Sequence, residues 1–231
     1  MAKKTTAQHI DNLNRNINDV RLLLGMYSGQ RTTKTGRPPK KLNVLSRSAL
    51  VLAVSSWESF IEDLARNGFN FLLSQSAEPN QFPSGVKVLA SEPLKKAEDR
   101  RTVWELAGSG WKLVLEKFRD ECLLNFDNPN SEKIDSLFNN LLGLPKLSKD
   151  WKWPGSSYET SVRHLNEIIR IRGDIAHRVK TTTHLSDKKV LRNIVFLYKL
   201  ATRSSNLVKV YLKNVTGVDP WGKVTYMKKY S

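Results

Sequence analysis

The sequence predicts an all-α fold, a helical bundle with irregular loop insertions, and three observations carry this prediction. Apolar residues recur at alternating spacings of three and four in the long segments, as on the buried face of a helix. Stretches rich in Gly, Pro, Asn and Ser separate those segments. No internal repeat or low-complexity tract occurs in the 231 residues, so we expect one domain over residues 1–231.

Two helices around a basic loop are predicted for the amino-terminal part. The first ends at Gly29, and its buried face is marked by Ile10, Leu13, Ile17, Val20, Leu24 and Tyr27. About residues 28–42 are predicted to form an exposed, mobile loop, because a glycine and two prolines break regular structure there. The second helix, about residues 43–73, is unusually apolar, so we expect it at the centre of the core, with Gly68 as the residue where it could bend.

The middle of the chain predicts shorter elements. Residues 86–90, VKVLA, are a candidate short strand, and two helices that meet at Gly108 and Gly110 follow it. A further short helix begins after turn residues 127–131 and is closed by Gly143.

Two long helices are predicted for the carboxyl-terminal part. A tryptophan-rich connector precedes the first, at about residues 158–179. Ser186 caps the second, whose buried face is marked by Val190, Leu191, Ile194, Leu197, Ala201, Val208 and Tyr211. An irregular tail follows over about residues 214–231.

The charge of the chain favours a polyanionic partner. Its 38 Lys and Arg against 22 Asp and Glu give a net charge of +16, which favours contacts with phosphates. The single Cys122 excludes an internal disulfide, and four scattered histidines give no zinc-ligand spacing, so we expect no metal and no cofactor. The longest apolar run, residues 49–54, is far shorter than the roughly 20 residues of a membrane span, so we expect a cytoplasmic protein.

An arginine interrupts the apolar face of the helix at about residues 158–179. Arg172 stands where an aliphatic residue is expected on a face marked by Val162, Leu165, Ile168, Ile169, Ile175, Ala176 and Val179. A guanidinium buried without a partner is costly, so it calls for a carboxylate or a phosphate beside it. Glu58 interrupts the apolar face of the second helix in the same way, and we predict that Glu58 orients Arg172.

His177 lies five residues after Arg172, so the two point about 140° apart on an ideal helix. Either Gly173 loosens the turn, or two protomers share one site about a two-fold axis. His177 shares its helix face with Asp174 and Arg170, and Asp174 could fix the imidazole tautomer. The alternative is structural: an Arg–Glu pair and a histidine that complements the helix dipole.

The segment IIRIRGDIAHR, with an arginine, four residues and a histidine near a helix end, resembles the signature of HEPN domains. SALVLAVSSWESFIEDLA, and NPNSEKIDSLFNNLLGL followed by SKDWKW, are similar to the preceding segments of the RiboL-PSP-HEPN branch. The resemblance covers roughly residues 43–180. The hexapeptide RGDIAH alone is a weak pattern, whereas the ordered series of segments is specific.

The resemblance implies a helical bundle that forms a homodimer with its motif helices at the interface. In active members it implies a metal-independent endoribonuclease, and many such proteins act in toxin–antitoxin or anti-phage systems. Arg172 would then stabilise the scissile phosphate, and His177 would move protons as the RNA 2′-hydroxyl attacks, in a basic cleft lined by both protomers. An antitoxin or another defence protein would be a further partner.

One residue departs from the family pattern. Active members usually carry asparagine or another polar residue after the motif arginine, where this chain has Gly173, followed by Asp174. Either the acid substitutes, or the domain is a non-catalytic module that binds nucleic acid or another protein.

Further basic and aromatic residues are candidates for nucleic-acid contacts. The predicted phosphate contacts are Lys34, Arg37, Lys40 and Lys41 in the basic loop, and Arg178 and Lys180 beside the motif. The loop sequence TKTGRPPKK matches a minor-groove DNA hook poorly, so a solvated or RNA-contacting loop is favoured. Trp151 and Trp153 could stack on bases, although packing under a loop is commoner. His9, His164 and His184 are expected at the surface.

Overall fold

The computed structural model describes residues 7–29, 43–178 and 185–225, and within these ranges every regular element is helical. The α-helices are α1 (Gln8–Gly29), α2 (Asn43–Gln75), α3 (Ser84–Lys96), α4 (Gly110–Leu124), α5 (Ser131–Leu142), α6 (Tyr158–Arg178) and α7 (Asp187–Thr216). Short 3-10 segments are η2 (Pro79–Gln81), η3 (Arg100–Leu106) and η4 (Leu147–Asp150). The predicted all-α fold is confirmed.

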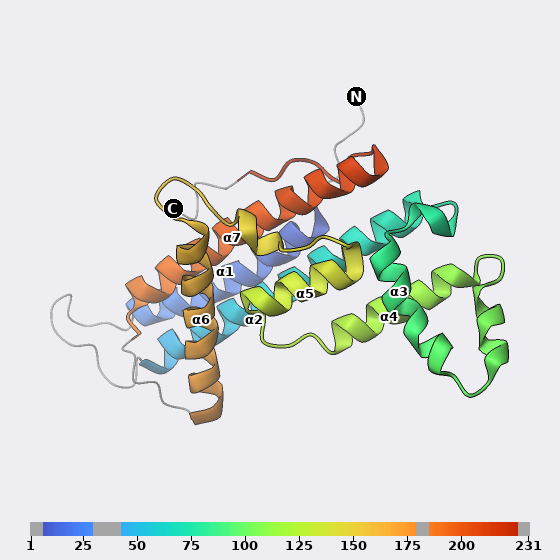
Figure 1. Cartoon of the computed structure of the whole chain (residues 1–231). Coiled ribbons are helices and arrows are strands. Elements are labelled where there is room, and N and C mark those ends of the chain that lie inside the picture. Colours follow the sequence, from blue (N-terminus) through green and yellow to red (C-terminus); the bar gives the residue numbers. More distant parts are fainter. Residues whose placement is uncertain (1–6, 30–42, 179–184, 226–231) are drawn as a thin grey trace.

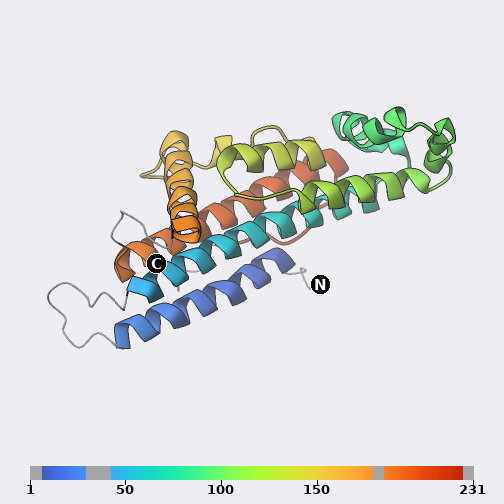
Figure 2. The same ribbon diagram turned by 90° about the horizontal axis from the view of Figure 1, so that it is seen from below.

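Helix α2 lies at the centre of the bundle, as predicted. It packs against α1 and α7 and also contacts α5 and α6, and Figures 1 and 2 show α1, α2 and α7 running side by side. Leu50, Trp57, Ile61 and Phe69 of α2 are fully buried. By length and composition α2 could cross a membrane, but its burial among other helices accounts for its apolar sequence.

Helix α6 crosses the long helices steeply instead of running along them (Figures 1 and 2). Leu165, Ile168 and Ile169 anchor it in the core, as predicted. Ile171 is also buried, although the predicted apolar face omitted it, whereas Ala176 is exposed. The carboxyl-terminal end of α6 therefore extends beyond the core.

Residues 86–90, the candidate strand, belong to helix α3, so that prediction is wrong. A strand would bury Val86, Val88 and Ala90 on one face. The structure buries Val86 and Ala90 and leaves Val88 54% exposed, and this spacing of four is the period of a helix. The first of the two helices predicted around Gly108 is replaced by η3, where Val103 is 55% and Trp104 75% exposed, so these apolar side chains gain little from packing against the bundle.

The predicted ends of α5 and α7 are confirmed by their caps. Gly143 closes α5 with a φ of 71°, and the Ser186 hydroxyl accepts from the Lys189 backbone N–H at 3.2 Å. The predicted face of α7 is buried except at Leu191, which is 42% exposed, and Tyr211, which is half-buried.

Gly68 does not bend α2, which runs unbroken from Asn43 to Gln75. A Cβ at position 68 would lie 3.1 Å from Leu142 Cδ1 of α5. Glycine therefore permits the close approach of α5 to α2.

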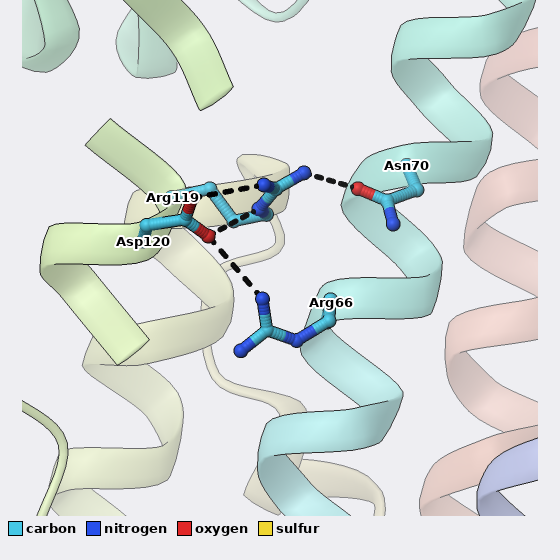
Figure 3. Close-up of polar contacts among 4 residues, drawn as sticks. All are labelled: Arg66, Asn70, Arg119 and Asp120. Carbon is cyan, nitrogen blue, oxygen red and sulfur yellow. Dashed lines mark hydrogen bonds and ion pairs between the residues drawn. The ribbon is translucent and has the colours of Figure 1, made fainter. Parts of the chain in front are cut away.

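A polar cluster at the surface fixes α4 to α2 (Figure 3). Arg119 donates to Asn70 Oδ1 at 2.6 Å and to the Asp120 carboxylate at 2.9 and 3.1 Å. Arg66 donates to the same carboxylate at 3.2 Å, and the Arg119 guanidinium lies 5.6 Å from the centre of the Phe69 ring. These contacts orient α4, and with it the loop that follows, against α2.

Several predicted residues lie outside the described ranges. They are Lys34, Arg37, Lys40 and Lys41 of the predicted loop, and Lys180 and His184 after α6. Arg178 is the last residue of α6. The described buried side chains form one hydrophobic core, and the tail from residue 217 to residue 225 is irregular, as predicted. The single domain over residues 1–231 stays a prediction.

Candidate active site

A cleft of about 800 Å³ opens between α2, α6 and the loop that leads into α5. Helix α6 lines it with Arg170, Arg172, Gly173, Asp174 and His177, and α2 lines it with Glu58. The loop and the start of α5 add Asp127, Asn128, Asn130 and Glu132. The fold thus brings every residue predicted as catalytic or supporting to the border of one cleft.

Arg172 is half-buried, and no ion pair joins it to another residue that the structure describes. Its Nε atom is buried without a hydrogen-bond partner. Glu58 borders the same cleft, but the ion pair predicted between these two residues does not occur among the side chains that the structure describes. Arg172 therefore presents a guanidinium that no described carboxylate neutralises by direct contact.

His177 borders the cleft together with Arg172 although α6 is continuous between them. The helix is not broken at Gly173, and no atom of a neighbouring residue lies within 4 Å of the place where a Cβ would stand. A loosened turn at Gly173 is therefore not what brings both side chains to the border of the cleft. His177 is exposed, so its imidazole is accessible from solvent.

Asp174 is bonded to Arg170 and not to His177. Its Oδ2 accepts from Arg170 Nη1 at 2.8 Å, while Glu167 accepts from Arg170 Nε and Nη2, both at 2.9 Å. The hydrogen bond from Arg170 holds the pKa of Glu167 below its usual range, and Glu167 in turn raises the pKa of Arg170. His177 is also one turn away from Asp174, so helix spacing allows either contact, and the structure forms the one with Arg170. The expected contact that would fix the tautomer is therefore not formed.

The charge of the cleft is mixed, in contrast to the basic cleft that was expected. Carboxylates from Glu58, Asp127, Glu132 and Asp174 line it beside Arg170, Arg172 and His177. Lys133 pairs with Asp127 at its edge. In the described part of the chain, no three His, Cys, Asp or Glu side chains are arranged to hold a metal ion. An anion that enters the cleft must therefore be attracted chiefly by Arg172.

The loop before α5 completes the cleft, and the sequence did not predict this role. Asn130 caps α5 by accepting from the Lys133 N–H at 3.0 Å. Asn166 of α6 accepts from the Ser131 N–H at 3.2 Å, and Trp57 of α2 donates to the Pro129 carbonyl at 3.2 Å. The Asn-Pro-Asn-Ser turn indicates a helix start. Its contacts with α2 and α6 join residues far apart in the sequence, so local sequence signals do not predict them.

Not all of the histidines that were predicted to be exposed lie at the surface. His9 is fully buried, with Nε2 2.8 Å from Ser205 Oγ and Nδ1 3.3 Å from Asn67 Nδ2. Burial lowers the pKa of His9 to about 4. His164 is half-buried, and its ring centre lies 4.1 Å from that of Phe196. Both histidines serve packing, and neither lines the cleft that His177 borders.

The two connector tryptophans have different environments. Trp151 is fully buried, and its Nε1 donates to Ser204 Oγ at 3.0 Å. Trp153 is half-buried and borders a surface groove. Packing, the commoner alternative, thus describes Trp151, while Trp153 keeps an accessible face.

The comparisons with known proteins identify the family. A family model described as RiboL-PSP-HEPN matches residues 13–210. No curated protein and no solved structure matches the chain. The match includes α2, the loop before α5, and the whole of α6 with Arg172 and His177. The chain therefore belongs to the RiboL-PSP-HEPN family.

Proposed function

We propose that the protein is an endoribonuclease of HEPN type that cleaves RNA without a metal ion or cofactor. The observation that carries the proposal is the half-buried guanidinium of Arg172, whose buried Nε has no hydrogen-bond partner within the described ranges, in a cleft that His177 also lines. A guanidinium that no described carboxylate contacts directly is suited to bind an anion, and a phosphodiester is the anion that the family implies.

The proposed reaction uses the RNA as its own nucleophile. The ribose 2′-oxygen attacks the adjacent phosphorus, and the bond from phosphorus to the 5′-oxygen of the next nucleotide breaks. His177 takes the 2′-hydroxyl proton or donates a proton to the leaving 5′-oxygen, because imidazole titrates near neutral pH. Arg172 neutralises charge on the nonbridging oxygens. The products are a 2′,3′-cyclic phosphate and a 5′-hydroxyl.

The proposed active form is a homodimer with two copies of α6 at the interface. The end of α6 extends beyond the core with Ala176 exposed and Ile175 half-buried, and a second copy would cover both. It would also bring a second Arg172 and His177 to the cleft, which would offset the carboxylates there. Glu58 and Asp174 are proposed as supporting groups, Asp174 through its ion pair with Arg170.

The biological setting is proposed from the family alone. It comprises a toxin–antitoxin or anti-phage system and an antitoxin or other defence protein as partner. A place in the cytoplasm without membrane attachment is proposed separately, from the shortness of the apolar runs in the sequence.

A non-catalytic nucleic-acid-binding or protein-interaction module is the second candidate. Two observations favour it: Gly173 stands where active members carry a polar residue, and four carboxylates line the cleft. The endoribonuclease cuts RNA and the second candidate does not. Its nucleic-acid-binding form would still bind RNA.

The deciding experiment is incubation of the purified protein with a mixed-sequence single-stranded RNA in EDTA, followed by analysis of the product ends. We expect cyclic-phosphate ends with the wild type and no cleavage with His177→Ala, because the proton carrier is then missing. RNA that is bound by both proteins and cut by neither would favour the binding module.

A matched control separates the cleft from the rest of the helix. Arg163→Ala changes an arginine of α6 that does not line the cleft, so we expect it to cleave like the wild type. Arg172→Ala should lower the single-turnover rate by at least about 100-fold, as loss of one charge-stabilising donor does elsewhere. Equal losses in both variants would argue against a specific role for Arg172.

A further inference from the structure

A second concave surface lies at the other end of α6. This groove of about 480 Å³ is formed by α7, the connector before α6 and the tail after α7, and we name it the Trp153 groove. Trp153, Arg203, Lys223, Lys199, Leu207 and Val210 are among its lining residues. Figure 1 shows the tail returning beside α7 toward the connector, far from the end of α6 that bears the cleft.

The walls of the Trp153 groove are held in place by the fold. The Trp153 and Ser156 backbones exchange two hydrogen bonds, at 3.1 and 2.9 Å, and the Trp153 ring centre lies 5.9 Å from that of Phe196. Asn206 donates to the Val224 carbonyl at 2.8 Å and accepts from the Val224 N–H at 2.9 Å. This pair fixes the tail, and therefore Lys223, beside α7.

The chemistry of the groove fits a planar ligand that carries negative charge. Its floor is apolar, its aromatic side chain is half-buried, and its lining includes three cations and no carboxylate. Arg203 is aimed by a hydrogen bond from its Nε to the Asp150 carbonyl, and its terminal nitrogens bond to no residue within the described ranges. A nucleotide supplies both a flat base for the tryptophan and a phosphate for the cations.

The positive charge of the groove favours a nucleotide over a basic peptide. Residues 226–231 carry Lys228 and Lys229 and no acidic side chain, so the side chains of this basic segment would be repelled by the cations of the groove. The cleft, by contrast, carries four carboxylates. A long polyanion therefore gains more from the Trp153 groove than from the cleft.

We propose that the Trp153 groove is an accessory RNA subsite that binds one nucleotide of a single-stranded substrate. The base stacks on Trp153 and the adjoining phosphates contact Arg203 and Lys223. The inference rests on the proposed function for its substrate class. Arg172 lies 14 residues after the first residue of α6, which is about 21 Å along the helix axis. One strand must therefore be several nucleotides long to occupy both sites.

Binding measured without cleavage tests the groove directly. In a His177→Ala background, fluorescence anisotropy of a labelled 12-nucleotide mixed-sequence RNA gives the affinity. We expect Trp153→Ala to weaken binding about tenfold and Trp153→Phe to weaken it less, because phenylalanine still stacks. Trp104→Ala is the matched control, since Trp104 is exposed on η3 and lies outside the groove, and it should bind like the parent.

Salt dependence tests the phosphate contacts separately. Lys223→Ala removes a side chain at the rim of the groove and leaves the core intact. It should lower the slope of log affinity against log salt by about 0.7, the value for one phosphate of a single strand. Trp153→Ala should leave that slope unchanged.

The two proposals fail in different ways. Parent-like affinity of both Trp153→Ala and Lys223→Ala would overturn the accessory subsite, even if the wild type cuts RNA. RNA that is bound through Trp153 but never cut would overturn the endoribonuclease and keep the subsite. No binding of RNA by the parent would overturn the subsite as well.

Discussion

The bundle core and the Arg172 cleft differ in the hydrogen bonding of their buried polar groups. In the core, His9 is hydrogen-bonded to Ser205, Trp57 to the Pro129 carbonyl, and Trp151 to Ser204. In the cleft, the Nε of Arg172 is buried without a partner. Within the described ranges, the other buried side-chain atoms without a hydrogen bond belong to neutral residues.

The difference indicates that the core serves stability and that the cleft serves the binding of a ligand. An unpaired neutral group costs little compared with an unpaired charge, which is retained where a ligand supplies the missing partner. We therefore expect changes in the core to alter stability, and changes in the cleft to alter activity while leaving stability the same or higher. Four predictions test that separation, from the largest expected effect to the smallest.

The largest loss of stability is expected for Trp57→Ala. Trp57 is fully buried, its ring centre lies 5.7 Å from that of Phe60, and it holds the loop before α5 through the Pro129 carbonyl. Truncation of a buried aromatic residue lowers the free energy of unfolding by about 3–5 kcal/mol. Urea denaturation measures the loss, with the exposed Trp104→Ala as control, for which we expect a change within about 0.5 kcal/mol. Similar losses in the two variants would contradict the assignment of Trp57 to the core.

The second effect is a loss of stability in mild acid that depends on His9. Burial lowers the pKa of His9 from 6.5 to about 4, so the unfolded chain binds a proton more readily than the folded one. The contribution of His9 to stability is complete above pH 6.5 and falls as the pH drops toward 4, by up to about 3 kcal/mol.

Comparison with a variant isolates this histidine from the carboxylates. His9→Gln cannot become protonated, so its free energy of unfolding should fall less between about pH 7 and pH 4 than that of the wild type, whatever its value at neutral pH. Parallel curves for the two proteins would refute the buried, neutral state of His9.

The third effect separates stability from activity in the cleft. Arg172→Met replaces a half-buried guanidinium, which forms no ion pair within the described ranges, with an apolar chain. Replacement of buried charge by apolar side chains is often neutral or stabilising, so we expect the free energy of unfolding to stay equal or rise by about 1 kcal/mol. RNA cleavage should be lost in the same variant. A loss of more than about 2 kcal/mol would instead show that Arg172 serves the fold.

The sequence predicted the helices better than the contacts between them. The bounds of α1, α2 and α5 to α7 follow from local signals, namely the spacing of apolar residues and the caps at Gly143 and Ser186. The strand at residues 86–90 was predicted wrongly because Val86 and Ala90, four residues apart, share one face in a strand and in a helix, and only the exposure of Val88 distinguishes the two.

In the site, too, features of a single helix were easier to predict than contacts between helices. Arg172 and His177 were predicted from their own helix, and the fold brings them to one cleft. The partner predicted for Arg172 was not found, because contact between Glu58 and Arg172 depends on how steeply α6 crosses α2. His9 was placed at the surface because its burial requires Ser205 and Trp221, which lie at least 196 residues away in the sequence.

The smallest effect concerns Gly173, the departure from the family pattern. Gly173 lies inside α6, and a Cβ at this position would meet no neighbouring atom within 4 Å. Gly173→Ala should therefore raise the free energy of unfolding by about 0.8–1 kcal/mol through helix propensity alone. The Cβ of Gly173→Asn would likewise meet no neighbouring atom within 4 Å, and this variant restores the polar residue usual in active members. If the missing polar group limits activity, Gly173→Asn will cleave RNA faster than Gly173→Ala in a single-turnover assay. Equal rates would show that the carboxylate of Asp174 already suffices, or that the cleft does not use a polar group there.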